Sequence, residues 1–181
     1  MANFRLRAGF GVLLAGILIT IGGCSEPSAV VDAGSEAGHR YQFVEGQQPV
    51  GGASYTVVGT PRVEQVIGPE GGTLQIPGGH TLAFPAGALS KPTRIQAKAD
   101  ARYVGVELEP HGLQFPAGNG PVLTLSMQAA QMNQFASFSI LYVSPSGTIL
   151  EVLSADADRV RNTLTTRLSH FSGYLAGGHR S

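Results

Sequence analysis

Short runs in which apolar and polar residues alternate dominate the chain from Tyr55 onward, with Gly and Pro between them. In the run VLTLSM at 122–127, the odd positions are apolar and the even ones include Thr124 and Ser126. Because successive side chains of a strand point to opposite faces, this alternation predicts a strand with one face on a core and one toward water. Runs of this kind lie at 55–58, 62–67, 73–76, 81–84, 93–99, 104–108, 122–127, 138–143, 149–153 and 162–168.

Many short strands separated by turn residues are typical of sandwiches and barrels. We therefore predict an all-β fold, with one small antiparallel β-sandwich or barrel-like domain at residues 55–181. Two segments are expected to be helical, 86–89 as a single turn and 128–135. Both are too short to change the fold class.

The first 24 residues have a different pattern. Arg5 and Arg7 precede an uncharged apolar stretch at 8–21, and Gly22 and Gly23 follow it. A basic start, an apolar run and small residues are the order of a secretory signal. The apolar run of about 14 residues is shorter than the roughly 20 that a membrane-spanning helix needs. We therefore expect residues 1–23 to be an export signal.

Residues 21–24, IGGC, resemble the lipobox of bacterial lipoproteins. The resemblance implies cleavage between Gly23 and Cys24 and a covalent lipid on the Cys24 thiol, which holds the protein on a membrane. Two or three acyl chains make such an anchor effectively permanent. Ser25 stands where the inner-membrane retention signal of this class has Asp. In a cell with an outer membrane, we therefore expect the periplasmic face of that membrane.

An ordinary signal peptide with an incidental cysteine is the alternative. Cys24 is the only cysteine of the chain, so no intrachain disulfide is possible. This favours lipidation as the use of the thiol.

Residues 24–54 are rich in small and polar residues and have no clear hydrophobic period. This composition predicts a lipidated, flexible linker with a root-mean-square span of roughly 30 Å. The alternative is a first strand at YQFV, residues 41–44, that docks on the domain.

Charge and motifs narrow the classes of function. Arg5 and Arg7 leave with the signal, so ten of the twelve Lys and Arg residues remain against twelve Asp and Glu. A net charge near minus two gives no reason to expect a nucleic-acid partner. The sequence has no nucleophile elbow, zinc-protease motif, P-loop or dinucleotide fingerprint. We therefore expect no cofactor besides the lipid and no enzyme activity apart from self-cleavage.

The pattern H-x-L-x-F-P-A-G occurs twice, at 80–87 and 111–118. Each copy is expected to be a strand with its Leu and Phe on one side, followed by a turn at Pro and Gly. Convergence of His80 and His111 on a metal ion is the alternative, although no further ligands stand at a suitable spacing.

Several motifs follow one another along the domain: IGPEGGTL at 67–74, LAFPAGAL at 82–89, TRI at 93–95, EPHGLQF at 109–115 and PV at 121–122. Over about residues 63–176 this series resembles the ZU-five domain, the β module of zonula occludens protein, ankyrins and netrin receptors. The resemblance implies protein interaction or scaffolding, without a cofactor or a shared substrate. The expected function is a noncatalytic module that docks an envelope protein.

The segment SHFSGY at 169–174 resembles the H-F-S sites at which some ZU-five-containing death-domain proteins, and a nuclear pore protein, cut themselves. Ser172 would attack the carbonyl carbon of Phe171, with His170 as the base. Such a reaction needs a strained bend at the cleaved bond. The alternative is an ordinary last strand through 168–173, in which Phe171 and Tyr174 pack in the core.

A ligand-binding or accessory hydrolytic module is a further alternative. Glu107 and Glu109 are two residues apart and are expected to share a strand face, most simply a solvated one. Binding of a carbohydrate needs an aromatic platform, and the chain has no Trp. The candidate platforms are Tyr55, Tyr103, Tyr142 and Tyr174.

Overall fold

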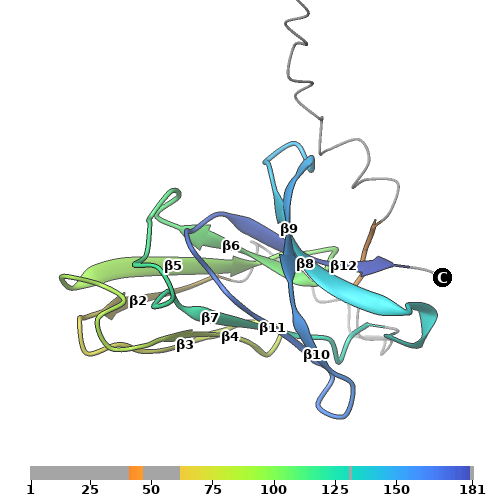
Figure 1. The fold of residues 1–181 in the computed structure, drawn as a ribbon, viewed down its shortest axis with the longest axis horizontal. Coiled ribbons are helices and arrows are strands. Elements are labelled where there is room, and N and C mark those ends of the chain that lie inside the picture. Colours follow the sequence, from red (N-terminus) through yellow and green to blue (C-terminus); the bar gives the residue numbers. More distant parts are fainter. Residues whose placement is uncertain (1–40, 47–61, 131, 180–181) are drawn as a thin grey trace, which may run out of the picture. The chain divides into compact units, whose positions relative to one another are not determined.

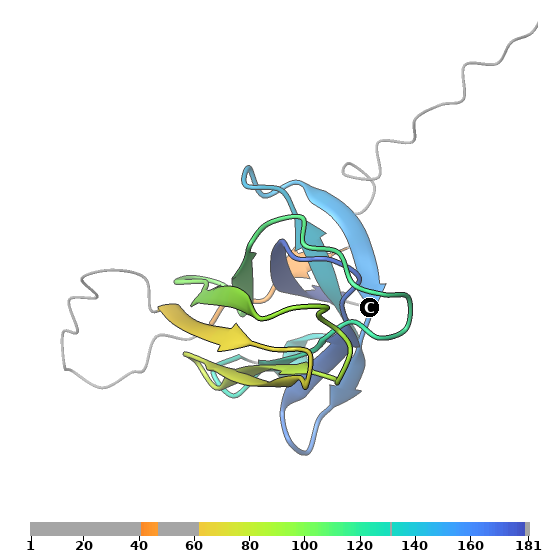
Figure 2. The ribbon, with the colours of Figure 1, turned by 90° about the vertical axis from the view of Figure 1, so that its left-hand side faces the viewer.

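The structure is a computed structural model that describes residues 41–46, 62–130 and 132–179. The export signal, Cys24, most of the expected linker and the strand expected at 55–58 lie outside these residues. Within them, two antiparallel sheets form the two layers of a sandwich (Figures 1 and 2). The all-β class predicted from the alternation is confirmed.

The larger sheet has seven strands. They are β1 (Gln42–Phe43), β2 (Arg62–Ile67), β5 (Thr93–Ala99), β6 (Gly105–Glu109), β8 (Ser137–Val143), β9 (Ile149–Ser154) and β12 (Gly173–His179). Their order is β2-β5-β6-β12-β8-β9, and β1 pairs with β12 off this path.

The smaller sheet has five strands. They are β3 (Gly72–Ile76), β4 (His80–Phe84), β7 (Val122–Ser126), β10 (Asp156–Asp158) and β11 (Thr163–Arg167), in the order β10-β11-β7-β4-β3. Both sheets end in edge strands and do not close on themselves. Of the two predicted architectures, the sandwich is the one that forms.

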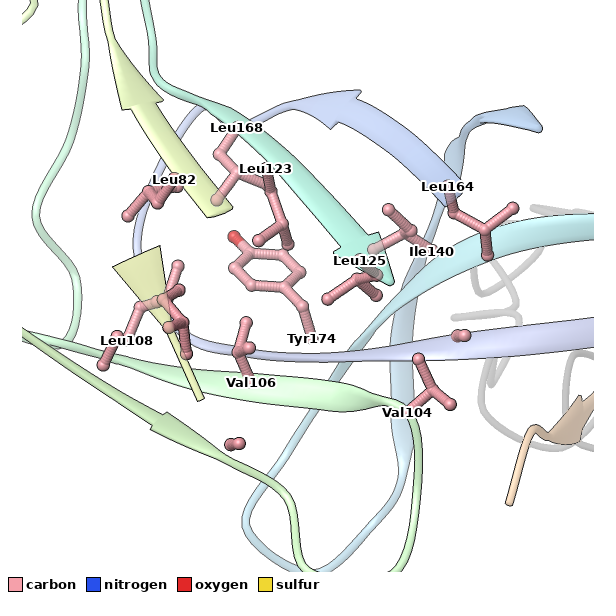
Figure 3. Packing of buried hydrophobic residues seen from close by; sticks show 14 of the residues in the cluster. Leu82, Val104, Val106, Leu108, Leu123, Leu125, Ile140, Leu164, Leu168 and Tyr174 are labelled. Carbon is pink, nitrogen blue, oxygen red and sulfur yellow. The ribbon is translucent and has the colours of Figure 1, made fainter. Parts of the chain in front are cut away.

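The core lies between the sheets. In β7, Leu123 and Leu125 are fully buried while Val122, Thr124 and Ser126 are partly exposed, as the alternation predicts. Burying such a side chain contributes roughly 1.5–3 kcal/mol. Figure 3 shows the ring of Tyr174, from β12, pointing toward Leu82 and Leu123 of the opposite sheet. Tyr174 therefore ties the centre of the larger sheet to the smaller one.

The first strand at 41–44, the alternative to a flexible linker, is present as β1. Gln42 and Phe43 pair with Gly178 and Gly177 of β12. The next residue, Val44, is buried, and its N–H donates to the carbonyl oxygen of Ala176 at 2.9 Å. The linker prediction is therefore wrong at 41–46. Backbone pairing with a strand far along the chain decides this, and the polar composition around YQFV does not reveal it.

The two segments expected to be helical form turns. Between residues 86 and 89 there is one turn, closed by the Ala88 N–H on the carbonyl oxygen of Pro85 at 3.1 Å. In the second segment the only helical residues described are the 3-10 turn η1 (Met132–Gln134). Short segments gain too few hydrogen bonds to offset helix nucleation. Within the described ranges, no helix has the length and apolar character needed to cross a membrane.

Candidate functional site

A groove of about 470 Å³ lies on the larger sheet, and Val143, Gly173 and Leu175 are among the residues that line it. Val143 and Leu175 belong to a small apolar cluster that is separate from the main core. Gly173 lies between its partners Glu107 on β6 and Val143 on β8. The groove therefore lies on the outer face of the sheet, over the place where β6, β12 and β8 meet.

Gly173 leaves this part of the groove open. A Cβ atom at residue 173 would meet only Val143, with its nearest contact at 3.5 Å, which is an ordinary van der Waals distance. Its φ is not in the left-handed region. Neither packing nor backbone conformation therefore requires glycine here, and a side chain at this position would enter the groove.

One wall of the groove is aromatic. The rings of Phe43 and Tyr103 pack edge to face, with their centroids 5.3 Å apart. The Asp100 carboxylate accepts the backbone N–H of Tyr103 at 2.7 Å. An Arg102–Glu45 ion pair of 2.9 Å joins the segment of Tyr103 to that of Phe43. Tyr103, one of the expected aromatic platforms, thus reaches the groove. The Arg102 guanidinium lies 5.0 Å from the centre of its ring.

The second wall is charged. The Glu107 carboxylate lies between the Lys98 ammonium, at 3.5 Å, and His111 Nε2, at 3.4 Å. All three side chains are about half exposed, so the Lys98–Glu107 ion pair contributes at most about 1 kcal/mol. Their effect is to present both signs of charge to a bound molecule.

Glu107 and Glu109 share a strand face, as predicted. Together with His111 they form the one group in the described part of the chain whose ligand atoms lie close enough for a shared metal ion, within 4.8 Å of one another. Lys98 contacts the same Glu107 carboxylate. A cation would therefore have to compete with this ammonium group for Glu107.

The turn between β8 and β9 forms a third side of the groove, through Ser144, Pro145 and Gly147. Ser144 Oγ lies 2.8 Å from Ser146 Oγ and accepts the backbone N–H of Thr148 at 3.1 Å. These bonds hold the turn in one conformation and place hydroxyl groups at the rim.

The predicted cleavage site lies just before β12. Phe171 is 1% exposed and packs against Phe84 and Phe115, with centroid distances of 6.0 and 5.0 Å. Its carbonyl oxygen, which self-cleavage would attack, accepts the N–H of Gly112 at 3.0 Å. The Ser172 carbonyl oxygen accepts the N–H of Leu108 at 3.0 Å. Backbone hydrogen bonds thus hold both residues of the bond that would be cut.

The expected base is turned toward tyrosines. The His170 ring lies against Tyr142, with centroids 4.9 Å apart, and its Nδ1 is 3.3 Å from the Tyr174 hydroxyl. Ser172 is 7% exposed and is one of the residues lining the groove. Among the described residues, no hydrogen bond joins Ser172 Oγ to the His170 ring.

The alternative of a regular last strand through 168–173 is only partly right. β12 begins at Gly173, and Phe171 and Ser172 are both buried, which breaks the expected alternation. Before it, His170 forms only an isolated bridge with Gln114. The predicted burial of Phe171 and Tyr174 in the core is confirmed.

The two copies of the repeated pattern differ in structure. The first contains β4, whereas the second makes only the bridge at Gln114, so the prediction of two strands is wrong for the second. Both nevertheless direct their Phe inward, and Phe84 and Phe115 pack with centroids 6.2 Å apart. Gly87 and Gly118 end the copies with φ of 78° and 73°, a conformation that favours glycine.

The two histidines of these copies have separate environments. His80 is buried in the smaller sheet, where its Nδ1 accepts the backbone N–H of Ser126 at 2.9 Å. Burial lowers its pKa below the usual 6.5. His111 lies at the groove beside Glu107. The group of potential metal ligands includes His111 and not His80, so the structure does not support the alternative in which the two converge.

Comparisons with known proteins add no relative: no protein-family model matches the chain, and no curated protein matches it. The lipobox and ZU-five resemblances therefore stay predictions from motifs. Sequence reasoning singled out Glu107, Ser172 and Tyr103 separately and did not place them in one groove. It gave no role to Lys98 or to the β8–β9 turn. For Phe43, the one indication in the sequence was the β-prone run YQFV.

Proposed function

We infer that this chain is a lipid-anchored lipoprotein of the cell envelope whose β domain binds a segment of another protein without catalysis. Lipid on Cys24 holds the domain at the membrane, on the periplasmic face of the outer membrane in a cell that has one. The ZU-five resemblance of residues 63–176 supports a role in protein interaction.

The observation that carries the proposal is the groove over Gly173. Its volume of about 470 Å³ is within the usual range for binding sites. The aromatic rings of Phe43 and Tyr103 line the groove together with charged groups of both signs, Lys98 and Glu107. Apolar surface with a few convergent polar groups is the composition that binds a defined ligand.

Noncatalytic binding agrees with the contacts of the candidate reactive groups. The Glu107 carboxylate is paired with Lys98 and His111, and the His170 ring contacts Tyr142. A nucleophile and its base are expected within hydrogen-bond reach of each other. Ser172 and His170 do not make this bond within the described part of the chain.

Site-specific photocrosslinking in cells tests the proposal. A photoreactive residue replaces Lys98 in the groove of the full chain, and the control carries it at the exposed Gln75 on β3 of the other sheet. We expect a discrete adduct with one envelope protein from position 98 and none from position 75. A Gly173→Val substitution, which fills the groove, should lower the yield at least about tenfold. Equal adducts from both positions would contradict the proposal.

A further inference from the structure

Besides the two-residue β1, four strands end the strand orders of the two sheets, and their residues differ in a way that bears on binding. β2 exposes one large apolar side chain, Val66, but it also carries Arg62 and Glu64, and Glu64 forms an ion pair with Arg94. β10 has the sequence Asp-Ala-Asp, and β3 exposes Thr73 and Gln75. Charged and polar side chains of this kind keep edge strands from pairing with other chains.

The edge strand β9 is less protected. Leu150 is 47% exposed and Val152 is 38% exposed, and these are two of the four large apolar side chains exposed in the described residues. Glu151 is the single charged residue of the strand. β9 ends the strand order of the larger sheet, so no strand among the described residues pairs with the side away from β8.

Local geometry explains the exposed leucine and sets the length of the free edge. Tyr142 pairs with Glu151 and Val143 pairs with Ile149, so Leu150 is the extra residue of a β-bulge. At the other end, the Thr166 hydroxyl donates to the carbonyl oxygen of Ser154 at 2.8 Å. Residues 149–153 therefore form the part of the edge that another strand can reach.

The charge of β9 is negative, because Glu151 is its single charged residue. The next strand along the chain, β10, belongs to the smaller sheet, and its Asp158 pairs with Arg161 at 2.9 Å. Arg159 donates to the carbonyl oxygen of Phe135 at 3.0 Å. An added strand would therefore meet the charge of Glu151.

We propose that β9 binds an extended segment of a partner protein, in which apolar residues alternate with Lys or Arg, as an added strand of the larger sheet. Backbone hydrogen bonds supply the pairing. Leu150 and Val152 contact the apolar side chains, and Glu151 selects basic residues. Like charges opposed across strands are destabilising, so Glu151 disfavours an acidic strand. This surface is distinct from the groove over Gly173.

Hydrogen exchange of the full chain in detergent micelles tests the proposal. The probe is a synthetic peptide, Lys-Val-Thr-Val-Lys-Val-Thr, with blocked ends, and the control peptide has Pro at its central Val. We expect the first peptide to slow exchange of amides within 150–153 by about tenfold or more, because pairing takes up their backbone groups. The Pro peptide should have no effect, because it cannot complete the ladder.

Two substitutions on exposed positions sharpen the test. Val152→Lys should weaken binding at least about tenfold, whereas Val66→Lys on the opposite edge of the same sheet should not. The Glu151→Lys variant should bind the basic peptide more weakly than the native chain does. It should bind the same peptide with Glu in place of Lys more tightly. The Gly173→Val variant, whose groove is filled, should bind the basic peptide as tightly as the native chain does. Failure of the groove proposal and failure of this one therefore remain distinguishable.

Three outcomes would overturn the proposal. Equal protection by the Pro peptide would mean that no strand is added. Protection of 150–153 without peptide, in a monomer, would show that another segment of this chain occupies the edge. Concentration-dependent dimers that Val152→Lys abolishes would assign the edge to a second copy.

Discussion

The hydroxyl of Tyr174 donates a hydrogen bond of 2.6 Å to the carbonyl oxygen of His170. Tyr174 is almost completely buried in β12, and His170 lies in the segment that leads into this strand. Burial raises the pKa of Tyr174, with smaller contributions from Glu151 and Tyr142, so the phenol remains a donor at neutral pH. The bond fixes the short segment that contains Phe171 and Ser172.

Replacing Tyr174 by Phe should lower the free energy of unfolding by about 1–2 kcal/mol, because the partly buried carbonyl oxygen of His170 loses its partner. Urea unfolding followed by circular dichroism measures this, since the chain has no Trp to report by fluorescence. Tyr142→Phe is the matched control and should change stability less. Equal losses in the two variants would show that the Tyr174–His170 hydrogen bond makes no specific contribution to stability.

The peptide bond between Phe171 and Ser172 is expected to stay intact in the purified full chain. The His170 ring contacts tyrosines, and the Phe171 carbonyl oxygen already accepts a backbone N–H. Intact-mass spectrometry after long incubation should give one species that extends through Ser181. A fragment ending at Phe171 that disappears in Ser172→Ala would instead establish self-cleavage with Ser172 as nucleophile.

Two glycines of neighbouring strands should respond differently to alanine. At Gly105, a Cβ atom would lie 2.5 Å from the backbone carbonyl oxygen of Tyr174, which cannot move aside cheaply. Gly105→Ala should therefore cost about 1–3 kcal/mol of stability. At Gly173 the nearest contact would be 3.5 Å, so Gly173→Ala should be nearly neutral. Thermal unfolding of the pair checks this, and a larger loss for Gly173→Ala would contradict the packing argument.

Stability should fall in mild acid because of His80. Its pKa in the folded chain is lower than 6.5 because of burial, so the unfolded chain binds a proton first as the pH falls. The contribution of His80 is complete above pH 6.5 and is lost as the pH falls through the folded pKa. In His80→Gln the amide oxygen can accept the Ser126 N–H without titrating. Urea unfolding at pH 7.5 and about 5 should show a smaller loss in this variant than in the native chain; equal losses would exclude His80 as the cause.

Cys24→Ser should release the chain from membranes, because the hydroxyl does not receive the lipid and no acyl chains remain to hold it. Labelled palmitate followed by membrane fractionation measures both properties. We expect label and membrane association in the native chain and neither in the variant. Label in the variant, or membrane association that persists without it, would contradict the predicted anchor.

The sequence alone was enough to predict the fold class and most strands of the sandwich. Strand β7 is the clearest case, because alternation of side chains is a local property that the order of Leu123, Thr124 and Leu125 expresses directly. The burial of Phe171 and Tyr174 and the shared face of Glu107 and Glu109 were also predictable. The predicted export signal and lipid anchor also come from sequence, since such predictions depend on a linear motif.

Tertiary structure decided which of these residues meet. Phe43, Tyr103, Glu107 and Gly173 form one groove because strands distant in sequence pair side by side, and residue order does not specify such pairing. The same pairing drew residues 41–46 into the larger sheet. It also left β9 at an edge with Val152 exposed. Alternation tells which face of a strand is apolar, but neighbours in the sheet depend on long-range backbone hydrogen bonds and on the space that the other strands leave.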